Sequence, residues 1–309
     1  MNFVIIGAGA VGGFLGARLQ NSGNKVTFLV RRKRYEQLRD EGLIVQSEGK
    51  VMRLPVKAIT DPSEVDQCDV LLIAVKSYSL SEVIESVRNL SQRGAYVVSF
   101  LNGIEQMERI RSTVPDEKIA GGVIHLQAMF DGQKVIQQGL EASIILGSLS
   151  KRPHAFVQSI SETFANAQLK TSVSENILLD LWKKYIFITI LSSLTGVCNA
   201  PIGPILQNKD TYYLFEEIAS EAVSVAKAVL SDMSPPTIAQ VCDQINNLPE
   251  NMTASMARDL ERGLPTEVEY IQGYMVKKAK QLGLSVPATT FCYRVLKLRE
   301  KGPVNMPKL

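Results

Sequence analysis

Apolar and polar positions follow two different patterns along this chain, and the change falls near residue 173. Before it, short apolar runs alternate with longer stretches in which apolar residues recur every three or four positions. Short apolar runs are typical of buried strands, and the wider spacing is typical of amphipathic helices. Their alternation predicts a doubly wound parallel α/β sheet with helices on both faces. The predicted strands are Phe3–Ile6, Val26–Val30, Val70–Val75, Val97–Leu101 and Ile119–Val123.

The end of this first part has a different strand pattern. Between residues 128 and 146 the apolar runs are shorter and a turn is expected at Asp131-Gly132, which predicts antiparallel strands. A strand near Leu169–Val173 follows. The short strands are Met129–Phe130, Val135–Ile136 and Ser143–Leu146. The predicted helices of this part are Val11–Gln20, Arg34–Arg39, Leu80–Leu90, Glu105–Ser112 and Phe156–Ala165.

After residue 174 the chain has helical spacing almost throughout, which predicts an all-α C-terminal domain. A length of 309 residues also favours two domains over a single core. We therefore predict an α/β domain over residues 1–173 and a helical domain over residues 174–309. The predicted helices of the second domain are Ile177–Val197, Tyr212–Leu230, Thr237–Asn246, Met256–Glu261, Val268–Leu282 and Thr289–Glu300.

Composition narrows the class of protein. A net charge of +3, with acids and bases interspersed, gives no basic stripe of the kind that binds nucleic acid. The longest apolar stretch, Tyr185–Val197, contains Ser and Thr and is shorter than the ~20 residues of a membrane span. Four separated cysteines and an N-terminus without a signal peptide predict a cytoplasmic protein. With two histidines, no metal site is expected, and an enzymatic proton donor would be Lys, Tyr or a carboxylic acid.

A glycine-rich loop joins the first strand to the first helix. Its residues are Gly7, Ala8, Gly9, Ala10, Val11 and Gly12, which match G-x-G-x-x-G. Such a loop lets the backbone approach a pyrophosphate, and the N–H groups of the helix N-terminus face the phosphates. The position between a strand and a helix raises the specificity of the motif, although a turn that binds nothing can have the same letters. The loop predicts a Rossmann domain that binds a dinucleotide.

The end of the second strand bears on which dinucleotide binds. An NAD site usually has Asp or Glu about 20 residues after the loop, on the ribose hydroxyl. Here the strand ends at Arg31, followed by three more basic residues and no acid. An arginine there suits the 2′-phosphate of NADP(H), and a solvated basic patch is the alternative. We predict that residues 1–173 bind NADP(H), with Arg31 on the 2′-phosphate.

Polar residues follow two other predicted strands. Lys76 comes after the strand at 70–75, and Asn102, which precedes Gly103, comes after the strand at 97–101. Ligands of doubly wound sheets bind beyond the carboxyl ends of the strands, so both are candidates for binding the nicotinamide half of the cofactor. A solvated lysine and a plain Asn-Gly turn are the alternatives. Their matching positions at two strand ends favour function.

Three residues of the helical domain are candidates for chemistry. Lys184 begins an apolar helical stretch, and a lysine in a desolvated cleft has a lowered pKa that suits proton donation. Glu267 lies between Thr266 and Glu269, which form a T-x-x-E capping box and would place it in the first turn of a helix. Ser255 stands at the start of a short helix. A surface lysine, a helix-start acid and a helix cap are the alternatives.

These residues stand in an order that resembles the ketopantoate reductase (2-dehydropantoate 2-reductase) family over nearly the whole chain. The glycine loop, Lys76 after Ala-Val, Leu-Asn102-Gly103 and Leu-Trp-x-Lys184 have the family's spacing. The block from Ser255-Met-x-x-Asp259 to Thr266-Glu267-Val-x-Tyr270-Ile-x-Gly273 also has it, and this block is more specific than the glycine loop.

The resemblance implies NADPH-dependent reduction of a small 2-oxo acid to the 2-hydroxy acid. The expected substrate is ketopantoate, and the product is pantoate for pantothenate and coenzyme A biosynthesis. The resemblance also implies that Lys184 protonates the carbonyl oxygen and that Glu267 is the essential carboxylate. Further implied contacts are Ser255, Asn102 and Lys184 on the substrate, and Arg31, Lys76, Asn102 and Glu267 on the cofactor.

Three positions depart from the family's polar pattern. Ile188 and Ser192 stand where the family usually has Asn, and Ile202 replaces another polar residue. These departures predict a less polar substrate pocket, so a related reductase for a more apolar 2-oxo acid is the first alternative. A non-catalytic NADPH-sensing module is the second, although it would need no acid–base pair. We expect no nucleic-acid or membrane partner, and we leave a homodimer open.

Overall fold

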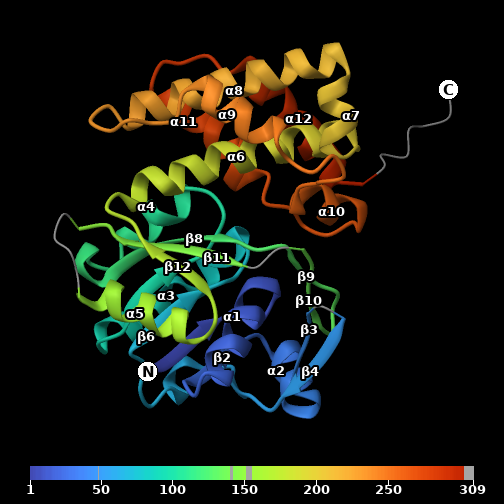
Figure 1. The fold of residues 1–309 in the computed structure, drawn as a ribbon. Coiled ribbons are helices and arrows are strands. Elements are labelled where there is room, and N and C mark those ends of the chain that lie inside the picture. The colour runs from blue at the N-terminus through green and yellow to red at the C-terminus, as the bar shows by residue number, and fades with distance from the viewer. Residues whose placement is uncertain (48, 140–141, 151–154, 303–309) are drawn as a thin grey trace. The chain divides into compact units, whose positions relative to one another are not determined.

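The computed structural model describes residues 1–47, 49–139, 142–150 and 155–302 (Figure 1). The chain divides into two compact units. The first consists of Met1–Leu101 with Gln106–Leu181, and the second consists of Asn102–Glu105 with Trp182–Leu309. Asn102 therefore belongs to the second unit, although it directly follows the strand region of the first. The two units divide within helix α6 (Ile177–Cys198). The domain boundary expected after residue 173 stays a prediction.

The first unit contains an eight-stranded sheet in the order β12-β11-β8-β7-β6-β1-β2-β5. All neighbours are parallel except β8 and β11. Chain order reverses at β1, whose neighbours are β2 and β6, and ligands of doubly wound sheets bind beyond the carboxyl ends at such a switch point. The strands are β1 (Asn2–Ile6), β2 (Lys25–Leu29), β5 (Lys57–Ile59), β6 (Val70–Ile73), β7 (Tyr96–Ser99), β8 (Ile119–His125), β11 (Ser143–Ser148) and β12 (Lys170–Val173).

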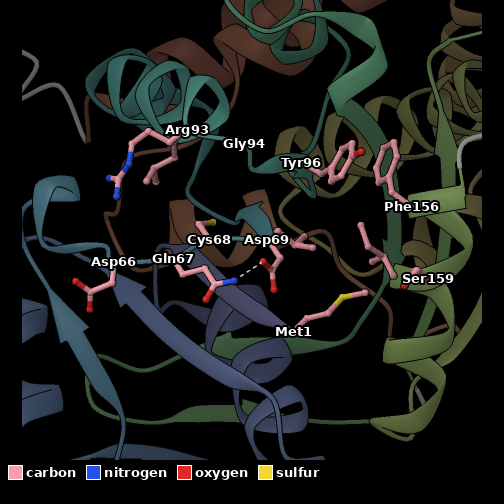
Figure 2. Close-up of a pocket in the computed structure, with 13 residues that line it drawn as sticks. Met1, Asp66, Gln67, Cys68, Asp69, Arg93, Gly94, Tyr96, Phe156 and Ser159 are labelled. Carbon is pink, nitrogen blue, oxygen red and sulfur yellow. Dashed lines mark hydrogen bonds between the residues drawn. The ribbon is translucent and has the colours of Figure 1, made fainter.

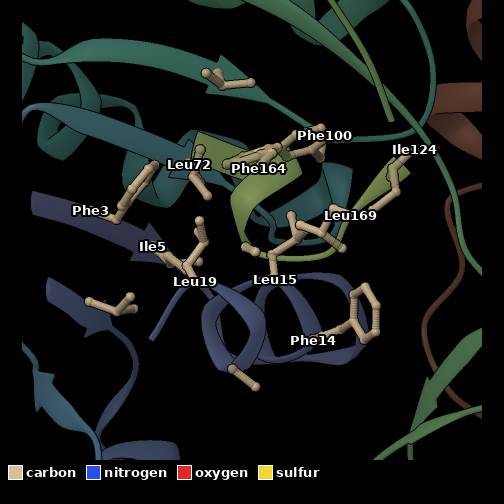
Figure 3. Packing of buried hydrophobic residues seen from close by; sticks show 14 of the residues in the cluster. Phe3, Ile5, Phe14, Leu15, Leu19, Leu72, Phe100, Ile124, Phe164 and Leu169 are labelled. Atoms are coloured by element: carbon tan, nitrogen blue, oxygen red, sulfur yellow. The ribbon is translucent and has the colours of Figure 1, made fainter. Parts of the chain in front are cut away.

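Helices cover this sheet, so the doubly wound fold predicted for the first domain is confirmed. At its centre β6 is fully apolar and β1 is apolar after Asn2, which fits strands that are buried on both faces. Figure 3 shows Phe3, Leu15 and Phe164 packed in the core of this unit. The helices are α1 (Ala10–Asn21), α2 (Arg32–Glu41), α3 (Leu80–Gln92), α4 (Glu105–Arg111) and α5 (Ala155–Asn166), with short 3-10 turns η1 (Pro62–Glu64), η2 (Ser77–Ser79) and η3 (Asp116–Lys118).

A small second sheet contains two strands that the sequence predicted and two that it did not. Its order is β4-β3-β10-β9, with β3 (Leu43–Ser47), β4 (Lys50–Leu54), β9 (Ala128–Phe130) and β10 (Val135–Gln137). The antiparallel pairing of β9 and β10 is confirmed. The sequence did not indicate β3, β4 or β5, because β4 is largely exposed and their apolar runs are very short. The expected strand at 143–146 is β11, which is antiparallel as predicted and pairs with β8 in the large sheet.

The described residues of the second unit form helices and no strand, which confirms an all-α C-terminal region. Two elements differ from the prediction. The short helix α7 was not expected, and the helix expected at 268–282 begins as a π-helix. Apart from α6, the helices are α7 (Ile202–Gln207), α8 (Lys209–Val229), α9 (Ile238–Asn246), α10 (Ser255–Glu261), the π-helix η4 (Glu269–Gly273), α11 (Tyr274–Gln281) and α12 (Pro287–Glu300). Within the described ranges, no helix combines the length and apolarity needed to cross a membrane.

Candidate active site

The glycine loop leaves open space where a phosphate would approach. Gly7 has φ +98°, and a Cβ there would lie 3.0 Å from the carbonyl oxygen of Ala74. A Cβ on Gly12 would lie 2.0 Å from the carbonyl oxygen of Gly7, so the helix can pack this close only without a side chain. A Cβ on Gly9 would meet nothing within 4 Å. Gly9 caps α1, whose first turn carries no acid, and the loop therefore fits a dinucleotide pyrophosphate.

Arg31 follows β2 and lies next to an acid that the local sequence did not reveal. Its Nη2 donates to the Oγ of Ser79 at 3.0 Å and to Oε2 of Glu82 at 2.7 Å. Ser79 and Glu82 come from the segment after β6, about fifty positions away in the chain. Both charged side chains are largely exposed, at 68% for Arg31 and 60% for Glu82. The predicted 2′-phosphate position thus contains a cation that is already paired.

Arg34 of α2 contacts the glycine loop, a contact that the local sequence did not indicate. Its Nε donates to the carbonyl oxygen of Ala8 at 3.2 Å, and its guanidinium lies 4.4 Å from the ring centroid of Phe130. Burial lowers the pKa of Arg34 below its ordinary value. The side chain therefore links α2 to the glycine loop and to Phe130 of β9 in the small sheet. In the sequence it was one of four consecutive basic residues, with nothing to single it out.

Lys76 lies at the same edge of the sheet as the glycine loop. It follows β6, which pairs with β1, and the amide of Ala74 donates to the carbonyl of Ile6 at 3.0 Å just before the loop. Lys76 is half-buried, and its carbonyl accepts from the amide of Ser79 at 2.9 Å. Its position at a carboxyl strand end is as the sequence predicted.

In the second unit, three predicted site residues from distant parts of the sequence lie together. Asn102 Nδ2 donates to Oε2 of Glu267 at 3.4 Å. Glu267 is only 4% exposed, and Lys184 is half-buried on α6. Burial lowers the pKa of Lys184 to about 8, and the negative charge of Glu267 opposes that fall. A lysine with such a pKa can release a proton near neutral pH.

The capping box expected around Glu267 is wrong. Thr266 does not bond to Glu269; instead its amide and its Oγ1 both donate to Oε1 of Glu300 in α12, at 2.9 and 2.8 Å. Glu269 accepts from the hydroxyl of Tyr293 and pairs with Lys297. Residues of α12 thus bond to both Thr266 and Glu269. The segment continues as a π-helix from Glu269. Glu267 is buried, so it is not a surface acid.

A buried polar cluster joins α6 to the π-helix that follows Glu267. Gln272 is fully buried, and its Nε2 donates to the Oγ atoms of Ser192 and Ser193 at 2.7 and 3.1 Å. The hydroxyl of Tyr185 donates to the carbonyl of Ile271 at 2.6 Å. The cluster fixes the helix of Lys184 against the segment of Glu267. Its signal in the sequence was the group of hydroxyl residues that interrupts the apolar stretch.

The remaining candidates have mixed surroundings. Ser255 is the first residue of α10 and is exposed, whereas the cap position belongs to Ala254. Ile188 lies one turn after the lysine and is half-buried. Ser192 is committed to the buried cluster, and Ile202 is a core residue whose amide donates to the carbonyl of Met252. Of the three departures from the family pattern, only Ile188 retains partial exposure.

A pocket of about 530 Å³ lies at the opposite end of the first unit's sheet, at the amino ends of β1, β6 and β7 (Figure 2). Three of its polar side chains, Gln67, Asp69 and Arg93, bond to other groups of the protein. Asp69 accepts from the amide and side chain of Asn2, and Arg93 donates to backbone carbonyls. Burial raises the pKa of the Cys68 thiol to about 12, so the thiol stays protonated. This pocket contains none of the predicted site residues.

Comparisons with known proteins show which family this chain belongs to. The family model described as Ketopantoate reductase PanE/ApbA matches residues 3–151, and the model of that family's C-terminal part matches residues 176–300. The uncharacterized oxidoreductase YkpB of Bacillus subtilis (strain 168) is 32% identical over 302 residues, covering 97% of this chain and 99% of the relative. The 2-dehydropantoate 2-reductase of Pyrococcus abyssi is 28% identical over 300 residues, covering 97% and 98%.

The fold is also similar to that of solved structures. A ternary structure of D-mandelate dehydrogenase with NADH and anilino(oxo)acetate has a TM-score of 0.89 and 24% sequence identity. The similarity covers 97% of this chain and 99% of that one. At this identity the likeness concerns the fold alone.

Proposed function

The chain belongs to the ketopantoate reductase (PanE/ApbA) family of oxidoreductases, which reduce 2-oxo acids with a nicotinamide dinucleotide, and from this premise we propose that it reduces a small 2-oxo acid with NADPH. The first candidate substrate is ketopantoate, which would give pantoate. The observation that carries the proposal is the lysine of α6 with a pKa of about 8 beside the buried carboxylate of Glu267.

The residues of the first unit are proposed to bind the cofactor. When bound, the dihydronicotinamide supplies the hydride. The N–H groups at the start of α1 would hold the pyrophosphate, since the loop leaves open space in front of Gly9. Arg31 would hold the 2′-phosphate by a charge-assisted hydrogen bond, and Lys76 would contact the nicotinamide half from the end of β6.

Proton transfer is proposed for the residues of the second unit. Hydride addition to a carbonyl carbon leaves negative charge on the oxygen, and Lys184 Nζ would donate a proton to that atom. Glu267 would keep the lysine protonated near neutral pH, because its charge opposes the effect of burial. Asn102 holds the Glu267 carboxylate by a hydrogen bond and is proposed to contact substrate and cofactor. The exposed hydroxyl of Ser255 would donate to the substrate carboxylate.

A more apolar 2-oxo acid is the second candidate substrate. It is favoured by Ile188, a half-buried apolar side chain one helical turn from Lys184. An isoleucine cannot hydrogen-bond a substrate hydroxyl, whereas it can pack against a branched or aryl group. The D-mandelate dehydrogenase of similar fold was solved with anilino(oxo)acetate, an aryl-bearing ligand.

The direct test is NADPH oxidation with a panel of 2-oxo acids: ketopantoate, an unsubstituted branched-chain 2-oxo acid and an aryl 2-oxo acid. We expect turnover of at least one, and the ratio of kcat/KM values between ketopantoate and the other two decides between the candidate substrates. NADPH binding without turnover of any member of the panel would refute the reductase and would favour a sensing module.

Cofactor preference has its own test. We expect Arg31→Ala to raise the KM for NADPH about 10- to 100-fold, because a hydrogen bond to a charged group contributes about 1.5–3 kcal/mol. The KM for NADH should change little. Arg32→Ala is the matched control, since Arg32 pairs with Glu36 and is 74% exposed. Equal losses for both cofactors would remove Arg31 from the 2′-phosphate.

A further inference from the structure

The arginine at the predicted 2′-phosphate position forms an ion pair with an acid from another part of the fold. Glu82 lies in the first turn of α3, and its Oε2 is 2.7 Å from Nη2 of Arg31. The same nitrogen donates to the Oγ of Ser79 at 3.0 Å. One nitrogen of the guanidinium is thus bonded by α3 and by the turn before it. All three residues belong to the first unit.

We propose that Glu82 is a cofactor-selectivity residue that weakens NADPH binding relative to NADH binding at this position. The inference rests on the proposed use of a nicotinamide dinucleotide by this unit. It goes beyond that function because Arg31 alone would predict a strong preference for NADPH, whereas the pair predicts a reduced one.

The chemistry of the two cofactors differs only at the 2′ position of the adenosine ribose. In NADPH a phosphate with a charge of about −1.5 to −2 must reach Arg31, so it either displaces the Glu82 carboxylate or shares the guanidinium with it. In both arrangements two anions lie near one cation. In NADH a hydroxyl occupies the position, and a hydroxyl can donate to a carboxylate, which is how acids select NAD in Rossmann domains.

The exposure of the pair sets the size of the effect. Arg31 and Glu82 are 68% and 60% exposed, so water and salt screen the carboxylate, and the ion pair itself adds little to folding stability. In water, the repulsion between two like unit charges about 4 Å apart changes a binding constant roughly fivefold. The 2′-phosphate carries nearly two charges, so its repulsion by the carboxylate is larger. Removing the Glu82 charge should therefore improve NADPH binding about 5- to 20-fold.

The test is direct titration of NADPH and of NADH into the full chain and into Glu82→Gln, followed by the fluorescence of the bound cofactor, without any 2-oxo acid. We expect the Kd for NADPH to fall about 5- to 20-fold and the Kd for NADH to stay the same or rise. The gain should shrink at high salt, because the charges are exposed. The exchange of an exposed carboxylate for an amide keeps the size of the side chain.

Glu85→Gln is the matched control. Glu85 lies one turn further along α3, is 73% exposed and pairs with Arg88 at 3.0 Å instead of Arg31. An equal gain from both variants would overturn the proposal, since it would show a general effect of net charge. An unchanged NADPH/NADH ratio in Glu82→Gln would also overturn it while leaving the reductase intact. Failure of the wild-type chain to bind either cofactor would overturn both.

Discussion

At the scale of single residues, two positions of the glycine loop require glycine for different reasons. A Cβ on Gly12 would collide with the carbonyl oxygen of Gly7, and that collision involves backbone atoms that cannot easily move. A Cβ on Gly9 would enter open space, and the backbone of Gly9 has φ −85°, which alanine can adopt. The requirement at Gly12 is therefore internal packing, whereas at Gly9 nothing in the protein requires a glycine, and we propose that a bound cofactor does.

This difference predicts opposite results for two alanine variants. Gly9→Ala should leave the melting temperature unchanged and weaken NADPH binding about tenfold or more, since an added methyl group in a filled site typically costs ~1–3 kcal/mol. Gly12→Ala should lower the melting temperature. Thermal unfolding and an NADPH titration on both variants measure this. Normal NADPH affinity in Gly9→Ala would mean that no ligand approaches the loop.

Lys184 has a pKa of about 8, which predicts the pH dependence of reduction. A lysine with a lowered pKa is protonated below that value and loses its proton as the pH rises through it. The kcat/KM for reduction should therefore be level below about pH 8 and fall tenfold per pH unit above it. In Glu267→Gln the charge that opposes the effect of burial is gone, so the break should move to lower pH. A level profile well above pH 8 would exclude Lys184 as the acid.

At the scale of elements, the segment after Glu267 is held by contacts that a helical pattern does not reveal. The amide of Gly273 donates to the carbonyl of Val268 at 2.9 Å, five residues back, which is the bond of a π-helix. Gln272 in this wide turn reaches the hydroxyls of Ser192 and Ser193 on α6. Gln272 thus connects the π-helix that follows Glu267 to the helix that carries Lys184.

We predict that Gln272→Ala destabilises the helical unit by about 2 kcal/mol or more, through lost hydrogen bonds and a cavity. Gln281→Ala is the control, because Gln281 is exposed on α11 and should change stability by less than about 0.5 kcal/mol. Urea unfolding followed by the single tryptophan, Trp182, reports on this unit, where that side chain is buried. Equal free energies of unfolding of the two variants would show that the Gln272 cluster does not stabilise the helical unit.

The same elements show what the sequence could and could not predict. The central strands were predictable because they are apolar on both faces, and the glycine loop was predictable because its spacing has a physical cause. The partners of Arg31, Thr266 and Glu267 were not, since Glu82, Glu300 and Asn102 lie far away in the chain. Local patterns such as T-x-x-E describe only neighbours. A long-range partner that satisfies the same group changes the outcome without changing the pattern.

At the scale of the whole molecule, the proposed tasks are divided between the two units. The glycine loop, Arg31 and Lys76 belong to the first, whereas Lys184, Glu267 and Asn102 belong to the second. Family membership holds for both, since the two family models match residues 3–151 and 176–300. This division makes the central claim testable, because a change in the second unit should remove chemistry and leave most of the cofactor affinity in place.

The most direct measurement is a steady-state assay of Lys184→Ala with the best 2-oxo acid of the panel, beside an NADPH titration of the same variant. Removal of a positioned general acid typically costs about 10²–10⁴ in rate, so we predict a fall of that size in kcat with little change in the Kd for NADPH. Lys183→Ala, which changes the exposed lysine next to it, should retain near-normal kcat. Near-normal kcat in Lys184→Ala would contradict the account, and loss of NADPH binding would place Lys184 in the cofactor site instead.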